Sequence, residues 1–177
     1  NKLKEDIKVC CVVKANAYGH GAVEVSKFLE REKVDYLAVS RLEEGIELRQ
    51  NNISTNILCL GYIPMSGMKA AIENNITITV YSLEMAIEIN NIAKQLNKKS
   101  TIHIKIDTGM HRLGFEEKEI DELINFLSKN KSLKVESAFS HLVAAEDKNE
   151  DEFTLKQIET FKRITDKLQN SLNITFL

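Results

Sequence analysis

Residues 7–39 read IKVCCVVKANAYGHGAVEVSKFLEREKVDYLAV, the pattern of a strand, a helix and a second strand. Residues 7–13 are almost continuously apolar and rich in valine, which is typical of a strand buried on both faces. Within residues 22–31 the apolar side chains recur near the helical period, and residues 36–39 form the next apolar run. The stretch therefore predicts a β–α–β unit with two parallel strands.

The same alternation continues along the chain. Further strands are expected at residues 56–60, 76–80, 101–106, 133–139 and 174–177, about seven in all. Helices are expected at residues 42–50, 67–73, 82–96, 118–128 and 153–168. Two α/β architectures fit this order, an open doubly wound sheet and a (β/α)8 barrel that lacks its end. No glycine-rich turn of the dinucleotide-binding type follows the first strand.

The composition is that of one globular domain, residues 1–177, with a small molecule as its partner. Hydrophobic residues make up 43% and charged residues 28%, enough apolar material for a sizeable core. The charges are spread along the chain with a net charge of -2, so neither a nucleic-acid stripe nor a polybasic membrane patch is present. No apolar run approaches the roughly 20 residues of a membrane helix, and no signal peptide opens the sequence.

The three cysteines, Cys10, Cys11 and Cys59, are an odd number, and two of them are adjacent within an apolar run. This pattern predicts buried thiols in a reducing compartment rather than a disulfide framework. The spacing is not that of zinc ligands, so no metal site is expected. We therefore expect a cytoplasmic protein.

Lys14 is the first candidate site residue, because ligands of both architectures gather at the carboxyl ends of the strands. A lysine directly after a buried strand either reaches out to water or is held for a purpose. In a pocket its amine can lose its proton and condense with an aldehyde. Gly19 and Gly21 permit backbone conformations and close approaches that other side chains would block. Position alone leaves both readings of Lys14 open.

A second cluster, KIDTGMHRLG at residues 105–114, follows the fifth expected strand. Lys105 and Asp107 are two residues apart on a strand and so face the same way. Arg112 lies beyond a glycine turn, where its donors could meet a phenolate, phosphate or carboxylate. The alternative interpretation is that these charged residues only form structural salt bridges at the mouth of the barrel. His141 follows the sixth strand, although a lone histidine is more often structural than catalytic.

Three motifs resemble signatures of the alanine racemases, a family of fold-type III pyridoxal-phosphate enzymes. They are VVKANAYGHGA around Lys14, KIDTGMHRLGF around Arg112 and, more weakly, FSHLVAAED around His141. The resemblance covers essentially the whole chain and implies a TIM-type (β/α)8 barrel, incomplete here. The related amino-acid decarboxylases share the lysine-alanine-asparagine core but not the following YGHG. The single-domain pyridoxal-phosphate-binding proteins carry a different lysine motif.

The resemblance also implies roles for individual residues. Lys14 would bind pyridoxal 5'-phosphate covalently and act as one of two catalytic bases. Tyr18 is similar to the tyrosine that binds the cofactor phosphate. Arg112 corresponds to an arginine that contacts the phenolic oxygen of the cofactor and the substrate carboxylate. Lys105 matches a lysine that many members carry in carbamylated form as a brace for that arginine, and His141 looks like the histidine that supports the second base.

By the same resemblance, the second base is a tyrosine of a separate β-rich domain in the partner subunit, outside this sequence. The chain is thus expected to be part of a larger homodimeric enzyme that supplies D-alanine for peptidoglycan. Alone, it is expected to bind the cofactor weakly and to be inactive. Alternatives are a serine or broad-specificity racemase, including one attached to a membrane domain, a non-catalytic pyridoxal-phosphate-binding protein, an ornithine-type decarboxylase and a purely structural domain.

Overall fold

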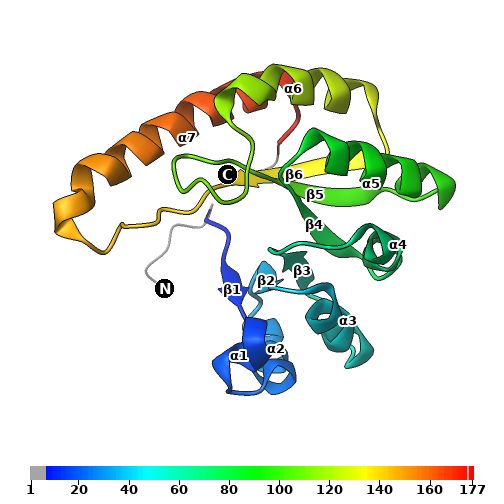
Figure 1. Ribbon diagram of the computed structural model, residues 1–177. Coiled ribbons are helices and arrows are strands. Elements are labelled where there is room, and N and C mark those ends of the chain that lie inside the picture. Colours follow the sequence, from blue (N-terminus) through cyan, green and yellow to red (C-terminus); the bar gives the residue numbers. More distant parts are fainter. Residues whose placement is uncertain (1–6, 175) are drawn as a thin grey trace. The chain divides into compact units, whose positions relative to one another are not determined.

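The computed structural model describes residues 7–174 and 176–177, in which helices alternate with parallel strands (Figure 1). The chain divides into two compact units, Asn1–Thr79 and Val80–Leu177. Each unit is built from strands with helices as their connections, so the α/β fold class predicted from the sequence is confirmed.

The strands of the first unit lie beside one another in chain order, and each pair is parallel. They are β1 (Cys10–Val12), β2 (Tyr36–Val39), β3 (Asn56–Cys59) and β4 (Ile76–Val80), which ends at the unit boundary. The connecting helices are α2 (Ala22–Arg31), α3 (Leu42–Gln50) and α4 (Met65–Glu73), and α1 (Lys14–Tyr18) is a short turn after β1. A doubly wound sheet reverses its strand order at the first βαβ switch point, so the sequential order favours a barrel.

Burial explains why these apolar runs became central strands. Every residue of β2 and of β4 is buried, as expected of parallel strands covered on both faces. The β4 sequence ITITV includes Thr79, a buried hydroxyl that needs a partner. Thr79 Oγ1 donates a hydrogen bond of 2.7 Å to the carbonyl oxygen of Cys59 on β3. The strand therefore carries polar atoms without leaving one unsatisfied at this position.

The second unit contains the parallel pair β5 (Ser100–Lys105) and β6 (Leu133–Phe139). Its helices are α5 (Leu83–Gln95), η1 (Glu117–Glu119), α6 (Ile120–Lys129), η2 (Lys148–Glu150) and α7 (Asp151–Ser171). At the expected seventh strand, Phe176 forms a single parallel bridge with Ser137 of β6, and residue 175 lies outside the described residues. Among the described helices none is long and apolar enough to cross a membrane.

The first strand differs from its expectation. The described strand covers three residues rather than residues 7–13, and the side chains of Cys10 and Val12 are exposed. Among the described residues β1 pairs with β2 alone, so it lacks the cover of a central strand. All three cysteines are free, but Cys59 is the one that is buried.

The buried face of α7 also differs from a simple count of its apolar residues. Leu155 and Ile158 are 59% and 44% exposed, whereas Ile164, Leu168 and the polar Gln157 are almost fully buried. Residues 157, 164 and 168 share one helix face, because they recur close to the 3.6-residue period. A buried glutamine on that face therefore has to find hydrogen-bond partners.

Candidate functional site

Lys14 lies at the carboxyl end of β1, where the chain makes a left-handed turn. The residues that follow it, Ala15 to Tyr18, have φ angles between 51° and 55° without any glycine among them. For residues with a side chain this conformation costs roughly 1–2 kcal/mol each. Such strain persists only where surrounding contacts impose it, and it clusters at functional sites. The Lys14 side chain is half-buried and Tyr18 is exposed.

Backbone and side-chain hydrogen bonds hold this turn on both sides. The Ala17 N–H donates to the Val13 carbonyl oxygen over 2.9 Å, and Val13 itself is buried. Asn16 joins the turn to α2, since its Oδ1 accepts from the Ala22 N–H at 2.8 Å. The carbonyl oxygen of Asn16 also accepts from the Gly21 N–H at 2.9 Å. These contacts offset part of the strain and fix the path of the chain after Lys14.

Glu44, near the start of α3, supplies a further contact to the turn. Its Oε1 accepts the Ala15 N–H at 2.7 Å, and its Oε2 accepts the N–H groups of Ser40 and Arg41 at 2.8 and 2.9 Å. Burial works against ionisation of this carboxyl, but the hydrogen bonds from Arg41, Ala15 and Ser40 outweigh it and hold its pKa below the usual value. Glu44 is thus an anion at neutral pH.

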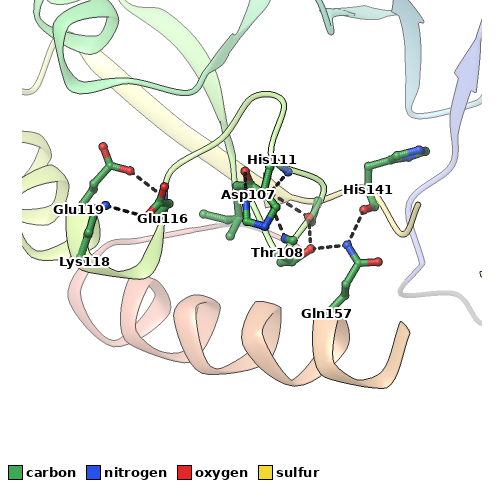
Figure 2. Close-up of polar contacts among 11 residues, drawn as sticks. Asp107, Thr108, His111, Glu116, Lys118, Glu119, His141 and Gln157 are labelled. Carbon is green, nitrogen blue, oxygen red and sulfur yellow. Dashed lines mark hydrogen bonds and ion pairs between the residues drawn. The ribbon is translucent and has the colours of Figure 1, made fainter. Parts of the chain in front are cut away.

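In the second unit, the loop after β5 presents Arg112. Asp107 shapes the start of the loop, because its Oδ1 accepts the N–H groups of Gly109 and His111 at 2.9 and 3.1 Å (Figure 2). A parallel bridge between Ile106 and Phe115 closes the loop. The exposed Arg112 side chain lines a hollow of about 320 Å³, whose other lining residues are Tyr81, Asp107, His111, Leu113, Gly114 and Glu116.

Lys105, the last residue of β5, has an unusual environment for a lysine. Its side chain is buried, and its Nζ lies 5.1 Å from the centroid of the Phe139 ring. Burial and the positive charge of Arg112 lower its pKa to about 8, although Asp107 acts in the opposite direction. A large fraction of this amine is therefore unprotonated at slightly alkaline pH, when it is nucleophilic.

A chain of hydroxyl groups connects the loops after β5 and β6 (Figure 2). Ser140 Oγ donates to the Ile106 carbonyl oxygen at 2.9 Å, so Thr108 Oγ1 must be the donor in its 2.8 Å contact with Ser140. Gln157 Nε2 completes the chain by donating to Thr108 Oγ1 at 3.1 Å. The same nitrogen donates to the His141 carbonyl oxygen at 3.1 Å.

The predicted site residues all lie at the carboxyl ends of strands, in two groups. Lys14 and Tyr18 share one turn of the first unit, and Lys105, Arg112 and His141 lie at the ends of β5 and β6 in the second. Lys105 and Arg112 are close enough to interact electrostatically. The His141 side chain is exposed, and its carbonyl oxygen is the atom that Gln157 holds.

Two residues that shape these loops, Glu44 and Gln157, were not expected from the sequence. Glu44 had a partial signal, because Ser40-Arg41-Leu42-Glu43 reads as a capping box one residue too early. In the structure Arg41 is the N-cap and Glu44 stands at the third helical position. Gln157 had no comparable signal, since a glutamine within a helix is ordinarily exposed.

Comparisons with known proteins place the chain in a family. The family described as alanine racemase, N-terminal domain, matches residues 1–177. Alanine racemase 2 of Caldanaerobacter subterraneus is 42% identical over 96% of this chain and 44% of its own. Alanine racemase of Methanococcus maripaludis is 44% identical over 93% of this chain and 44% of its own. The solved alanine racemase of Clostridium difficile in complex with cycloserine has a TM-score of 0.94 at 50% identity, covering 98% of this chain and 48% of that one.

The fold defines a domain of the parallel β/α barrel type, with a lysine at the carboxyl end of its first strand. The chain belongs to the alanine racemase N-terminal domain family. The likeness to the solved structure confirms the expected barrel fold, incomplete within this sequence. The chain spans about half the length of the relatives it matches.

The residues of the first unit fit a pyridoxal phosphate group. The fit rests on an amine and a phenol, those of Lys14 and Tyr18, carried by the same short turn. Within the described residues the Lys14 amine forms no ion pair, so it is not committed to a structural partner. Gly19 and Gly21 have φ angles of +88° and +92°, and nothing lies within 4 Å of the position of a Cβ on either. The backbone after the turn thus leaves room for a ligand.

Proposed function

We propose that this chain is the cofactor-binding part of a pyridoxal-phosphate-dependent alanine racemase. In this role the complete enzyme interconverts L-alanine and D-alanine in the cytoplasm and supplies D-alanine for cell-wall peptidoglycan. Family membership and relatives that are themselves alanine racemases support the proposal. The observation that carries it is the position of Lys14 at the start of a strained turn at the end of β1.

Racemisation removes the α-proton from one face of the amino acid and returns a proton to the other, so it needs two bases. Pyridoxal phosphate, when bound, supplies the electron sink that makes the α-proton acidic. Lys14 would hold the cofactor, and its amine would exchange the proton on the D-face. A tyrosine of the partner subunit, outside this sequence, serves the L-face, and His141 supports that base. A homodimer follows from this division of the site.

The remaining residues bind and orient. Tyr18 would hold the cofactor phosphate through its hydroxyl, and Arg112 would bind the cofactor and the substrate carboxylate. Lys105 would brace Arg112 once its unprotonated amine has added to carbon dioxide and released a proton, which leaves a carbamate anion in place of a repelling cation. The pKa of Lys105, about 8, supports this role because carbamylation needs the unprotonated amine. An ion pair with Arg112 would then offset the free-energy cost of burying the charged Lys105 side chain.

The test is a racemase assay of the complete protein supplied with pyridoxal phosphate. L-Alanine and L-serine are offered in parallel, and the D-enantiomer and carbon dioxide are both measured. The proposal expects D-alanine to form faster than D-serine, with no release of carbon dioxide. A faster reaction with serine would reassign the substrate, and decarboxylation or no turnover would refute a racemase. Residues 1–177 alone are expected to show weak cofactor binding and little or no activity.

A further inference from the structure

Capping of α3 does not account for all the hydrogen bonds of the Glu44 carboxylate. A glutamate at the third position of a helix commonly accepts the N–H of the N-cap residue, which here is Arg41. One carboxylate oxygen, Oε2, is sufficient for that bond and for the adjacent N–H of Ser40. Capping of α3 therefore leaves the role of the other oxygen unexplained.

That other oxygen, Oε1, binds the N–H of Ala15, which is 29 positions away in the sequence. Ala15 directly follows Lys14 and is the first of the residues with positive φ. The peptide plane between Lys14 and Ala15 carries this N–H, so its orientation fixes the backbone from which the Lys14 side chain departs. With a donor–acceptor distance of 2.7 Å, the bond has the short length of a charge-assisted hydrogen bond.

We propose that Glu44 is a positioning residue for Lys14, whose carboxylate holds the peptide after Lys14 in the left-handed turn and thereby directs the lysine amine. The inference rests on the proposed function, since it assigns Glu44 a part in cofactor binding. Glu44 needs no contact with cofactor or substrate for this role. It acts through the Ala15 N–H, and its bonds to Ser40 and Arg41 keep the carboxylate itself in place.

The test compares Glu44→Gln with Glu119→Gln in the complete protein. Glu119 is a matched control, because it also stands at the third position of a short helix and accepts the N-cap N–H of Glu116 at 2.7 Å. It lies in the second unit and caps η1. Both substitutions remove a capping carboxylate, but Glu44→Gln alone leaves an amide group facing an N–H donor of the Lys14 turn. Glu44→Asp retains the charge on a shorter side chain and tests for rescue.

Two measurements separate positioning from general stability. Hydrogen exchange followed by mass spectrometry reports on the peptide that contains residues 13–19, and a titration gives the dissociation constant of pyridoxal phosphate. Glu44→Gln is expected to raise both the exchange rate and the dissociation constant by about tenfold to a hundredfold, the weight of one hydrogen bond to a charged group. Glu119→Gln is expected to leave both within about twofold of wild type. Glu44→Asp should lie between wild type and Glu44→Gln.

The inference is overturned if Glu44→Gln and Glu119→Gln bind the cofactor equally well and exchange equally slowly in residues 13–19. It is also overturned if Glu44→Gln keeps exchange in residues 13–19 and cofactor binding within about twofold of wild type, because the carboxylate would then not be needed to hold the turn. A wild-type protein that does not bind pyridoxal phosphate refutes the proposed function instead. The exchange measurement on the turn is made without cofactor and so remains informative in that case.

Discussion

Gln157 Nε2 donates a hydrogen bond of 3.1 Å to Thr108 Oγ1, joining the N-terminal part of α7 to the loop that follows β5. Both the nitrogen and the oxygen of the Gln157 side-chain amide form hydrogen bonds. Its nitrogen also donates to the His141 carbonyl oxygen, and its Oε1 accepts the Val143 N–H at 3.2 Å. One buried side chain therefore ties together the two loops that carry Arg112 and His141 (Figure 2).

Replacing Gln157 with methionine, which keeps the length and volume, should lower the free energy of unfolding by roughly 2–4 kcal/mol. The reason is that Thr108, His141 and Val143 each lose a hydrogen-bond partner in a buried or half-buried position. Chemical denaturation of the complete protein measures the change. Thr165→Val on the same helix is the control, because Thr165 Oγ1 bonds within α7, to the carbonyl oxygens of residues 161 and 162. Equal losses in the two variants would contradict the account.

Gly114→Ala should destabilise the protein by roughly 2–4 kcal/mol and distort the loop that presents Arg112. Gly114 has a φ of +139°, and a Cβ there would lie 2.4 Å from the backbone nitrogen of Asp107. Gly19→Ala is the comparison, since its φ of +88° adds strain but nothing lies within 4 Å of the new atom. That variant should lose about 1 kcal/mol. Denaturation midpoints that fall equally in both would argue against a steric cause.

Much of the fold could be predicted from the sequence, because parallel strands buried on both faces are rich in apolar and β-branched residues. Residues 36–39 and 76–80 were expected as strands and are strands with the same bounds. The Lys14 turn could not be predicted in this way. Alanine and asparagine have no pattern that specifies four left-handed residues in succession. The turn is held by the local bond of Asn16 to Ala22 and by Glu44, which is 29 positions away from Ala15 in the sequence.

The positions of the candidate site residues could be predicted from the sequence, but the residues that hold their loops in place could not. Lys14, Arg112 and His141 could be found because they follow strands, and strand ends are where ligands bind in such folds. The contacts of Gln157 depend on which face of α7 is buried. Only some of its apolar residues mark that face, since Ile164 and Leu168 are buried beside Gln157 whereas Leu155 and Ile158 are exposed. Long-range polar partners of this kind carry no local sequence signal.

Lys105 is expected to carry an added carboxyl group in the native protein at about pH 9 with bicarbonate, and to lose it at about pH 6. Burial and Arg112 lower the pKa of this amine to about 8, so the reactive unprotonated form grows as the pH rises through that value. Native mass spectrometry detects the added mass, and Lys105→Ala should lack it. Lys99, an exposed lysine just before β5, is the control in Lys99→Ala. An unmodified wild-type mass under both conditions would rule the modification out.

Acid should destabilise the first unit through Glu30. Its Oε1 accepts hydrogen bonds from the side chains and backbone N–H groups of Ser54 and Thr55, and these bonds lower its pKa from 4.5 to about 2. A carboxyl whose pKa is lower in the folded state stabilises the protein above its unfolded pKa. That stability is lost as the pH falls from 4.5 towards 2.

Urea denaturation of Glu30→Gln over this range should show a flatter dependence on pH than wild type. Glu24→Gln serves as the control, since Glu24 forms only an exposed ion pair with Lys27 among the described contacts. If wild type and Glu30→Gln lose stability in parallel, the carboxylate of Glu30 does not have the stabilising role assigned to it.

The absorption spectrum of the complete protein with pyridoxal phosphate tests the role of Lys14 most directly. Wild type and Lys27→Ala, which removes an exposed lysine of α2, are both expected to show the band of a cofactor bound covalently to a lysine. Lys14→Ala is expected to lack that band while remaining folded. The same band at full strength in Lys14→Ala would contradict the account, because another amine would then hold the cofactor.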